Sequence, residues 1–103
     1  MSQDPSQNEI TILAETFRLL GDPTRLRILL NCQHEPKAVG EIVESLDLSQ
    51  TLVSHHLRLL RGARLVRGDR KARQIFYQVS DDHVSDMLTF MVSHINEDHD
   101  EAE

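Results

Sequence analysis

Apolar residues recur every three or four positions in five segments of the chain, which predicts five amphipathic helices. In the first segment, which ends before Gly21, they form two faces rather than one. One face consists of Ile10, Leu13, Ala14, Phe17 and Leu20, and a second is added by Ile12 and Leu19. Two apolar faces exceed what one core contact needs, so we expect this helix to pack both inward and against a partner subunit.

The second to fourth segments are short and closely spaced. Asp22-Pro23 predicts the start of a helix, with Asp22 as its cap and an inner stripe at Leu26, Leu29 and Leu30. A third helix is marked by Val39, Ile42, Val43 and Leu46, after a connector over residues 33–37. A tight turn at Asp47-Leu48 then leads to Ser49, which is placed to cap a fourth helix that runs to about Arg61. Two short helices joined by a brief turn predict a helix-turn-helix.

The apolar period changes to two after the fourth helix. Ile75, Tyr77 and Val79 alternate with polar or exposed positions, and Leu65-Val66 precede them. Between these runs lies Gly68-Asp69-Arg70-Lys71, which predicts a β-hairpin with a basic tip. The hairpin would form the wing of a winged helix-turn-helix, so the predicted fold class is mainly α with a small β-hairpin.

A helical period returns after Ser80. Its apolar stripe consists of Val84, Met87, Leu88, Met91 and Ile95. We expect one domain over residues 9–97, a flexible N-terminus over residues 1–8, and a disordered acidic tail over residues 98–103. A domain of this size gains stability from dimerisation.

The charge is distributed unevenly along the chain. Of the eleven Lys and Arg residues, seven lie between residues 49 and 80 beside a single acid, Asp69, whereas residues 81–103 hold eight acids and no Lys or Arg. This distribution predicts a polyanion-facing surface on the helix-turn-helix and wing and a cation-facing surface on the last helix, despite a net charge of −6.

No apolar run approaches a membrane span of about 20 residues, and the polar start does not resemble a secretory signal. We therefore expect a cytoplasmic protein that does not bind a membrane. Cys32 is the only cysteine, which excludes an internal disulfide and favours a buried, inert thiol.

Four potential metal ligands lie along the last helix in the pattern Asp81-x-His83 and His94-x-x-Glu97. The eleven positions from His83 to His94 make about three turns, so the imidazoles share a face but lie roughly 16 Å apart. Zinc ligands lie about 2.0 to 2.2 Å from the metal, so one chain cannot close the site. If the helix crosses a second copy antiparallel to itself, Asp81 and His83 of one chain meet His94 and Glu97 of the other.

Two longer motifs carry a family resemblance. The run Gly21-Asp22-Pro23-Thr24-Arg25-Leu26-Arg27-Ile28-Leu29 and the run from Leu48 to Leu60, LSQTLVSHHLRLL, resemble the ArsR/SmtB family of winged-helix metal-sensing repressors. The resemblance covers residues 10–97. It implies a homodimer through the first and last helices, and a transcriptional repressor that leaves its operator DNA when it binds metal.

The zinc-sensing branch of that family has the ligand pattern that falls here on Asp81, His83, His94 and Glu97. Two nitrogens and two carboxylate oxygens suit tetrahedral Zn²⁺, and Co²⁺ can occupy the same site. Ni²⁺ prefers more ligands, which Asp98, His99 or the N-terminus would have to supply. The thiophilic branches have cysteines near residues 38–41 or in the second helix; Ala38, Val39 and Gly40 are non-ligands. Asp47 replaces the family's usual turn Gly, and Asp tolerates the left-handed conformation.

The exposed face of the fourth helix predicts contacts with double-stranded operator DNA. Base-edge contacts are expected from Gln50, Ser54 and His55, with Thr51 on the same face, whereas Arg58, Arg70, Lys71 and Arg73 are better suited to phosphates. His56 is expected to be a structural histidine near the core. His34 and His99 are interpreted as structural or solvent-facing.

Three alternatives carry different functions. An enzyme would need an open zinc position, a nucleophile motif or a phosphate loop; the sequence shows no such motif, and four protein ligands leave no place for water. A nickel- or cobalt-sensing repressor could use extra ligands from the tail. A metal-buffering dimer without DNA binding is the third alternative, and the basic block over residues 49–80 argues against it.

Overall fold

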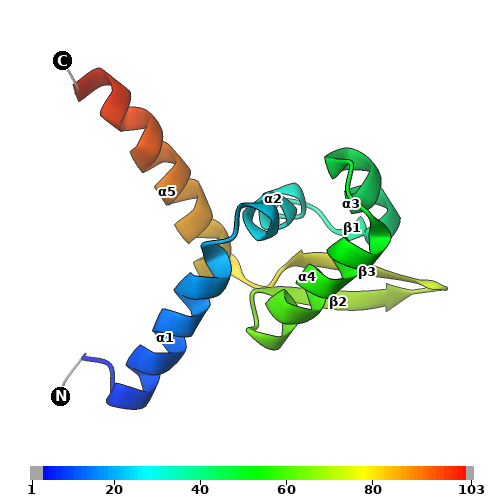
Figure 1. The fold of residues 1–103 in the computed structure, drawn as a ribbon, viewed down its shortest axis with the longest axis horizontal. Helices are drawn as coiled ribbons and strands as arrows, with labels where there is room; N and C mark the ends of the chain where they lie inside the picture. Colours follow the sequence, from blue (N-terminus) through cyan, green and yellow to red (C-terminus); the bar gives the residue numbers. More distant parts are fainter. Residues whose placement is uncertain (1–3, 102–103) are drawn as a thin grey trace.

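The computed structural model describes residues 4–101, and the side chains of residues 4–97. Five helices and three strands follow one another along the chain (Figure 1). In order they are α1 (Gln7–Leu20), α2 (Pro23–Asn31), β1 (Lys37–Ala38), α3 (Val39–Leu46), α4 (Gln50–Gly62), β2 (Val66–Lys71), β3 (Gln74–Val79) and α5 (Asp82–Glu101). The predicted winged helix-turn-helix is confirmed.

Helix starts follow the expected capping chemistry. Asp22 Oδ2 accepts a hydrogen bond from the Arg25 backbone N–H at 3.0 Å, and Pro23 takes the first helical position of α2. At α1 the cap is Ser6, which exchanges hydrogen bonds with Glu9 in a capping box. This cap starts α1 at Gln7, within the segment over residues 1–8 that was expected to be a flexible N-terminus.

The helix-turn-helix is formed by α3 and α4. Asp47 ends α3 with a φ of 57°, the left-handed conformation expected where the family usually has glycine. Ser49 Oγ then accepts the Leu52 backbone N–H at 3.1 Å and caps α4. The predicted turn and cap are therefore confirmed.

The wing differs from the expected hairpin in two ways. The sheet has three strands in the order β1-β3-β2, because Lys37 and Ala38 pair with Tyr77 and Phe76 of β3. The tip lies at Ala72 and Arg73, since Gly68 to Lys71 continue β2 and pair with Gln74 to Tyr77.

The small size of Gly68, not backbone freedom, explains its position inside β2. A Cβ atom there would lie 3.0 Å from both the Tyr77 ring and the Ile75 side chain, so glycine leaves room for these cross-strand neighbours. Ala72 instead takes the left-handed turn position, with a φ of 58°. The glycine signal was therefore misread as a turn signal.

The core lies where α2, α3 and α4 pack on the sheet. Its buried members include Ile28, Leu29, Ile42, Val53, Leu57, Leu60, Val66 and Val79. Two expected core positions were wrong: Leu30 is 42% exposed and Leu52 is 38% exposed, because each lies at the edge of its helix's buried arc. Ile28 and His56 are buried in those helices instead. Cys32 is fully buried, as expected, and burial raises the pKa of its thiol to about 11.

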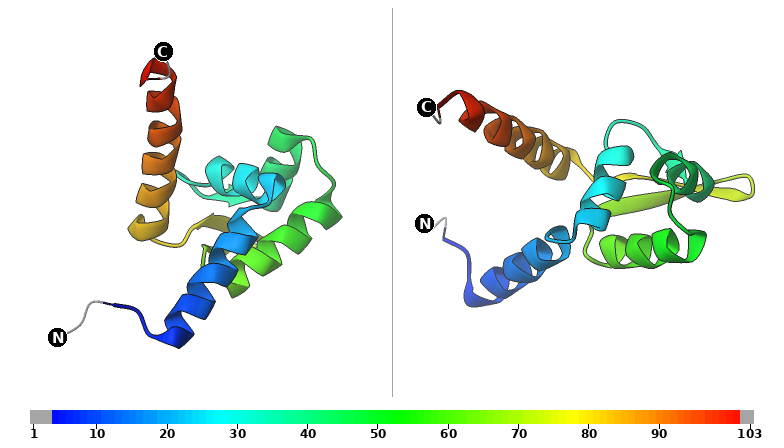
Figure 2. Two further views of the ribbon diagram at one scale, coloured as in Figure 1. Left: turned by 60° about the vertical axis from the view of Figure 1, so that its left-hand side comes forward. Right: turned by 45° about the horizontal axis from the view of Figure 1, so that its top comes forward.

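Helices α1 and α5 project from this core like two arms (Figure 2). α1 was expected to pack inward as well as outward, but its buried residues are confined to its last turn, at Leu19 and Leu20. The first half of α5 is held by Gln33, whose amide donates to Ser85 O and Thr89 Oγ1, each at 2.9 Å. α5 continues to Glu101, beyond the boundary expected at residue 97. Among the described residues, no helix is long and apolar enough to cross a membrane.

Candidate functional site

Asp81 has a structural role beside its predicted role as a ligand. Its Oδ1 accepts the Val84 backbone N–H at 3.1 Å, which caps the N-terminus of α5. The same oxygen lies 3.7 Å from His83 Nδ1, and both side chains are exposed. Two donor atoms about 2.0 to 2.2 Å from a tetrahedral zinc would lie roughly 3.3 to 3.6 Å apart. The Asp81–His83 pair therefore fits one half of a zinc site with little adjustment.

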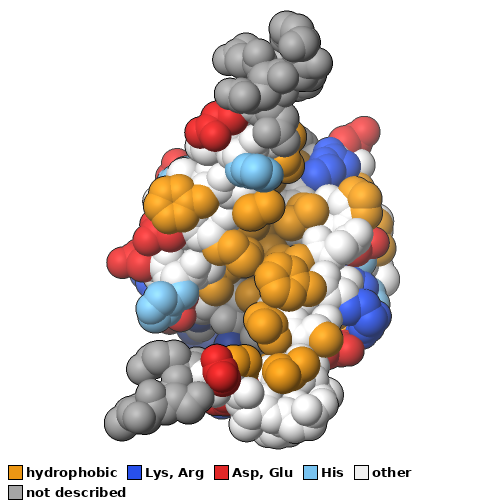
Figure 3. Space-filling model, turned by 90° about the vertical axis from the view of Figure 1, so that its left-hand side faces the viewer, with side chains coloured by type: hydrophobic (Ala, Val, Ile, Leu, Met, Phe, Trp, Pro, Cys, Tyr) orange, Lys and Arg blue, Asp and Glu red, His pale blue; other side chains and the backbone are white. Residues whose placement is uncertain are grey.

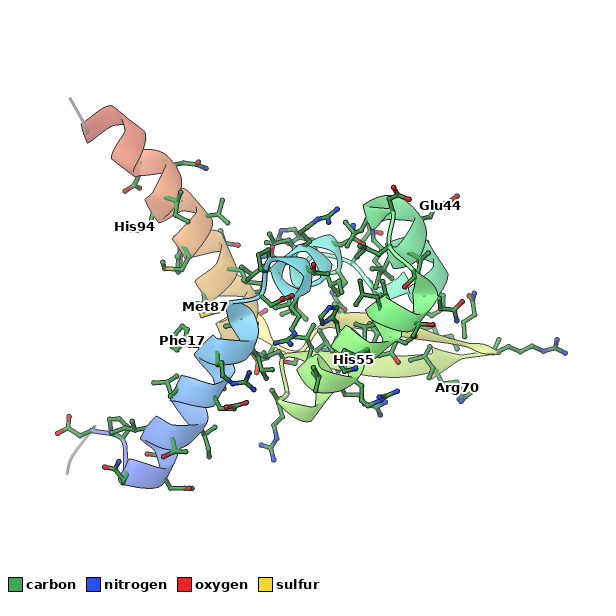
Figure 4. The ribbon with its side chains drawn as sticks, in the orientation of Figure 1. Phe17, Glu44, His55, Arg70, Met87 and His94 are labelled. Carbon is green, nitrogen blue, oxygen red and sulfur yellow. The ribbon has the colours of Figure 1, made fainter. Side chains whose placement is uncertain are left out.

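The other half lies further along the same helix. His94 and Glu97 are three positions apart on α5, so they are neighbours on its surface, and both side chains are exposed. In Figure 4 His94 lies on the part of α5 that projects away from the winged core. Within the described residues, no group of three or more His, Cys, Asp or Glu side chains converges on one metal position. One chain thus presents two half-sites rather than a closed site.

The donor chemistry fits zinc, and the described residues supply two imidazoles and two carboxylates for it. The side chains of Asp98 and His99, which a nickel site would need, lie outside those the structure describes. His34, the other histidine interpreted as structural or solvent-facing, is exposed in the loop before β1.

The two half-sites lie beside a large apolar surface between the arms. Figure 3 shows hydrophobic side chains gathered along the face between α1 and α5. Phe17 of α1 is 56% exposed, and Phe90 and Ile95 of α5 are 68% and 60% exposed. Exposed apolar patches of this kind mark interaction surfaces.

The candidate DNA-binding surface lies on α4 and the wing. Gln50, Thr51, His55 and Arg58 are exposed on α4, and Ser54 is half-buried. Arg70 and Lys71 are exposed at the end of β2, and Arg73 is exposed in the turn at the tip (Figure 4). The structure therefore brings the predicted DNA-contacting residues to two adjoining elements.

His56 is the structural histidine that the sequence predicted. It is 8% exposed, and its Nδ1 accepts a hydrogen bond from Arg25 Nε at 3.1 Å. Burial is the main cause that lowers the pKa of His56 below its ordinary value. Nearby charges have smaller effects: Asp22 raises the pKa, whereas Arg25 and His55 lower it further. A neutral His56 therefore joins α2 to the inner side of α4, the second helix of the helix-turn-helix, which is called the recognition helix below.

The junction between β3 and α5 contains a functional candidate that sequence reasoning missed. Ser80 Oγ donates to the Arg64 carbonyl at 2.6 Å, and the Ser80 N–H donates to the Leu65 carbonyl at 3.1 Å. Arg64, with a φ of 63°, lies in the loop after α4. Ser80 is adjacent in the chain to Asp81, so one half-site is connected directly to the end of the recognition helix.

His94, the candidate ligand further along α5, does not lie near this segment within one chain, because α5 carries it away from the core (Figure 4). Ser80 holds the Arg64 carbonyl instead. A polar Ser-Asp pair between a strand and a helix was the signal that could have revealed the Ser80 contact; it reads in sequence as an ordinary helix cap.

Comparison with known proteins places this arrangement in a family. A family model described as "Bacterial regulatory protein, arsR family" matches residues 22–67. The HTH-type transcriptional repressor SmtB of Mycobacterium tuberculosis is 33% identical over 94 residues, which are 91% of this chain and 70% of that protein. The chain belongs to the ArsR family.

Other family members agree along most of the chain. The HTH-type transcriptional regulator NmtR of M. tuberculosis is 39% identical over 82 residues, which are 80% of this chain and 68% of that protein. The solution structure of apo-NmtR superimposes with a TM-score of 0.78 at 34% identity and covers 94% of this chain and 82% of that one. The structure of NolR from Sinorhizobium fredii gives a TM-score of 0.76 at 34% identity, over 89% and 95% of the two chains.

Family membership decides between the broad classes of function. The relatives are named as transcriptional repressors and regulators, and the fold is that of a DNA-binding winged helix-turn-helix. The prediction of a transcription regulator rather than an enzyme is therefore confirmed.

Proposed function

We propose that this member of the ArsR family is a metal-responsive transcriptional repressor. It binds operator DNA as a metal-free homodimer and leaves it when zinc occupies two equivalent sites, each formed by both chains. Each site takes Asp81 and His83 from one chain and His94 and Glu97 from the other. As an operator-binding protein it works in the compartment that holds the DNA, which for a bacterial regulator is the cytoplasm.

The observation that carries the proposal is the separation of two exposed half-sites along α5. Asp81 and His83 form a pair with donor atoms 3.7 Å apart at the start of the helix, and His94 and Glu97 lie about three turns later. The apolar side chains of α1 and α5 flank both pairs and are exposed in a single chain. A second copy that covers this surface in the antiparallel sense completes both sites together.

Zinc would be held by two imidazole nitrogens and two carboxylate oxygens, and when bound it would join the two α5 helices. Asp81 Oδ1 lies 3.7 Å from His83 Nδ1 and accepts the α5 cap bond with one lone pair, so its second lone pair remains for the metal without loss of the cap. Each imidazole must be deprotonated at the ligating nitrogen, so protons compete with the metal and the apparent affinity for zinc should fall in acid. Cobalt suits the same donors, whereas nickel would recruit further ligands such as Asp98 and His99.

The decisive test is a purified heterodimer that carries His83→Ala on one chain and His94→Ala on the other, selected with two different affinity tags. In a site shared between chains, one of its two pockets loses both imidazoles and the other keeps all four ligands. Equilibrium dialysis should therefore find one tightly bound zinc per heterodimer, two per parent dimer, and none in either mutant homodimer. A heterodimer as depleted as the mutant homodimers would overturn the shared site.

A metal-buffering dimer without DNA binding remains the alternative function. The exposed basic and hydrogen-bonding residues of α4 and the wing favour the repressor instead. The metal-free dimer should bind a pseudo-palindromic duplex from its own promoter with half-sites about one helical turn or more apart, with an affinity that falls steeply with salt. Failure to bind that duplex at low salt would leave the buffering dimer.

A further inference from the structure

A small polar pocket lies between the recognition helix and the wing. It encloses about 230 Å³ and is lined by Ser54, Leu57, Arg58 and Arg61 of α4, Tyr77 of β3 and Val39 of α3. This volume is below the roughly 300 to 1,000 Å³ typical of small-molecule sites, so it suits a small group better than a metabolite.

The polar groups that line the pocket have no partners of their own. Arg58 and Arg61 form no ion pair and no side-chain hydrogen bond within the part of the chain that the structure describes, and neither do the hydroxyls of Ser54 and Tyr77. Two guanidinium groups three positions apart on a helix repel each other. An anion between them would relieve that repulsion and accept hydrogen bonds from both.

The position of the pocket indicates the source of the anion. Arg58 belongs to the exposed face of α4 that also carries Thr51 and His55, and Tyr77 belongs to the strand that continues into the basic wing. DNA that lies along α4 and the wing would pass this opening. Arginine forks and hydroxyl groups are the side chains that typically bind backbone phosphates.

We propose that the pocket binds one backbone phosphate in each half of the operator DNA, through Arg58, Arg61, Ser54 and Tyr77. This inference rests on the proposed DNA-binding function and changes the predicted DNA interface in two ways. Ser54 contacts phosphate rather than a base edge, and Arg61 and Tyr77 join the interface. Because the phosphate touches both α4 and β3, it fixes the angle at which the recognition helix enters the major groove.

The first test compares Arg61→Gln and Tyr77→Phe with Arg27→Gln, which removes the same charge from an exposed position on α2. Operator affinity of the metal-free dimer should fall about tenfold or more for Arg61→Gln, and less for Tyr77→Phe, which removes one hydroxyl. The plot of log affinity against log salt should become shallower by about 2 in Arg61→Gln, one phosphate per chain, and stay unchanged in Arg27→Gln. Circular dichroism checks that each variant folds.

The second test locates the phosphate. A series of operator duplexes carries one neutral methylphosphonate at each successive backbone position of a half-site. The parent should lose affinity when the phosphate is neutral at any of several positions. At one of these positions Arg61→Gln should lose no further affinity, because the variant and the neutral phosphate remove the same contact and their effects are not additive. Tyr77→Phe should show a weaker effect at the same position.

The outcomes separate this inference from the proposed function. A parent that binds no operator would remove the function itself. A parent that binds operator while Arg61→Gln behaves like Arg27→Gln, or stays additive at every phosphate, would overturn the pocket alone. Inorganic phosphate that shifts the Tyr77 NMR signals of the free protein, without coupling to any DNA phosphate, would assign the pocket to a free anion and overturn the DNA assignment.

Discussion

The core, in which α2, α3 and α4 pack on the sheet, and the two helical arms, α1 and α5, differ in how far their apolar residues are buried. In the core, Ile28, Ile42 and Leu60 are fully buried within a single chain. On the arms, Phe17, Phe90 and Ile95 are each more than half exposed. The core is therefore complete in one chain, whereas the arms are complete only when another surface covers them.

The largest effect is expected from Phe90→Ala, because its side chain is the most exposed large apolar group on α5. Truncating an aromatic that is buried in an interface costs about 2 kcal/mol or more, and a two-fold dimer loses it twice. The dimer should therefore weaken about a thousandfold. Analytical ultracentrifugation measures the dissociation constant, and Leu52→Ala, a half-exposed apolar residue outside the arms, should leave it unchanged.

Ile42→Ala should have the opposite signature. Ile42 is 0% exposed in the core, so its truncation should lower the free energy of unfolding by about 2 to 5 kcal/mol. The loss, measured as the free energy of unfolding of the dimer to two unfolded chains, should be the same at every protein concentration. The Ile42→Ala protein should also remain dimeric at urea concentrations below its unfolding transition. An Ile42→Ala dimer that dissociated before its unfolding transition, with a dissociation constant raised as far as in Phe90→Ala, would contradict the division into core and arms.

This division also explains what the sequence could predict. Hydrophobic periodicity located all five helices, and the Asp22 and Ser49 caps were assigned correctly, because capping depends on a few neighbouring residues. Periodicity reports that a face is apolar, not what covers it, so α1 was expected to pack inward along its length. Gly68 was read as a turn residue because its need for space beside Tyr77 arises from a strand that pairs with it across the hairpin.

The candidate site was predicted unevenly for the same reason. The candidate ligands His83, His94 and Glu97 lie on α5 and Asp81 caps it, so helix geometry shows that the four form two pairs. Their closure into a site depends on a second chain and stays a proposal. Ser80 and Gln33 were missed because their partners, Arg64 and Thr89, are distant in sequence and are brought near by the tertiary fold.

A smaller effect should appear in the pH dependence of the core. The pKa of His56 is lowered from its ordinary value of 6.5, so its stabilising contribution is complete above pH 6.5 and is lost as the pH falls through the folded pKa. The reason is that the unfolded chain takes up the proton first, and a proton on Nδ1 would remove the acceptor for Arg25.

The free energy of unfolding, measured in urea, should therefore fall between pH 7 and pH 5 by about 1 kcal/mol more in the parent than in His56→Gln. The glutamine keeps a hydrogen-bond acceptor but does not titrate. His55→Gln, an exposed neighbour, serves as the control. Equal slopes for the parent and His56→Gln would mean that Arg25 does not sense the protonation of His56.

An effect of similar size is expected at the contact between core and arm. Ser80→Ala removes the hydrogen bond to the Arg64 carbonyl while leaving the Asp81 cap and all four candidate ligands in place. If metal at Asp81 shifts the end of α4 through this bond, the variant should bind zinc with the parent's affinity but retain DNA about five- to tenfold more tightly in its presence. That change corresponds to about 1 kcal/mol of coupling.

By linkage, the same factor must appear when zinc affinity is measured with and without operator, so the two experiments check each other. Ser45→Ala, an exposed serine on α3 without a side-chain hydrogen bond in the described structure, is the control. Unchanged coupling in Ser80→Ala would leave two routes for the signal: a hydrogen bond from His94 to the Arg64 segment of the partner chain, or repacking of the two α5 helices. A His94 variant that keeps a ligand atom but lacks the second ring N–H distinguishes them, because it should impair release only by the first route.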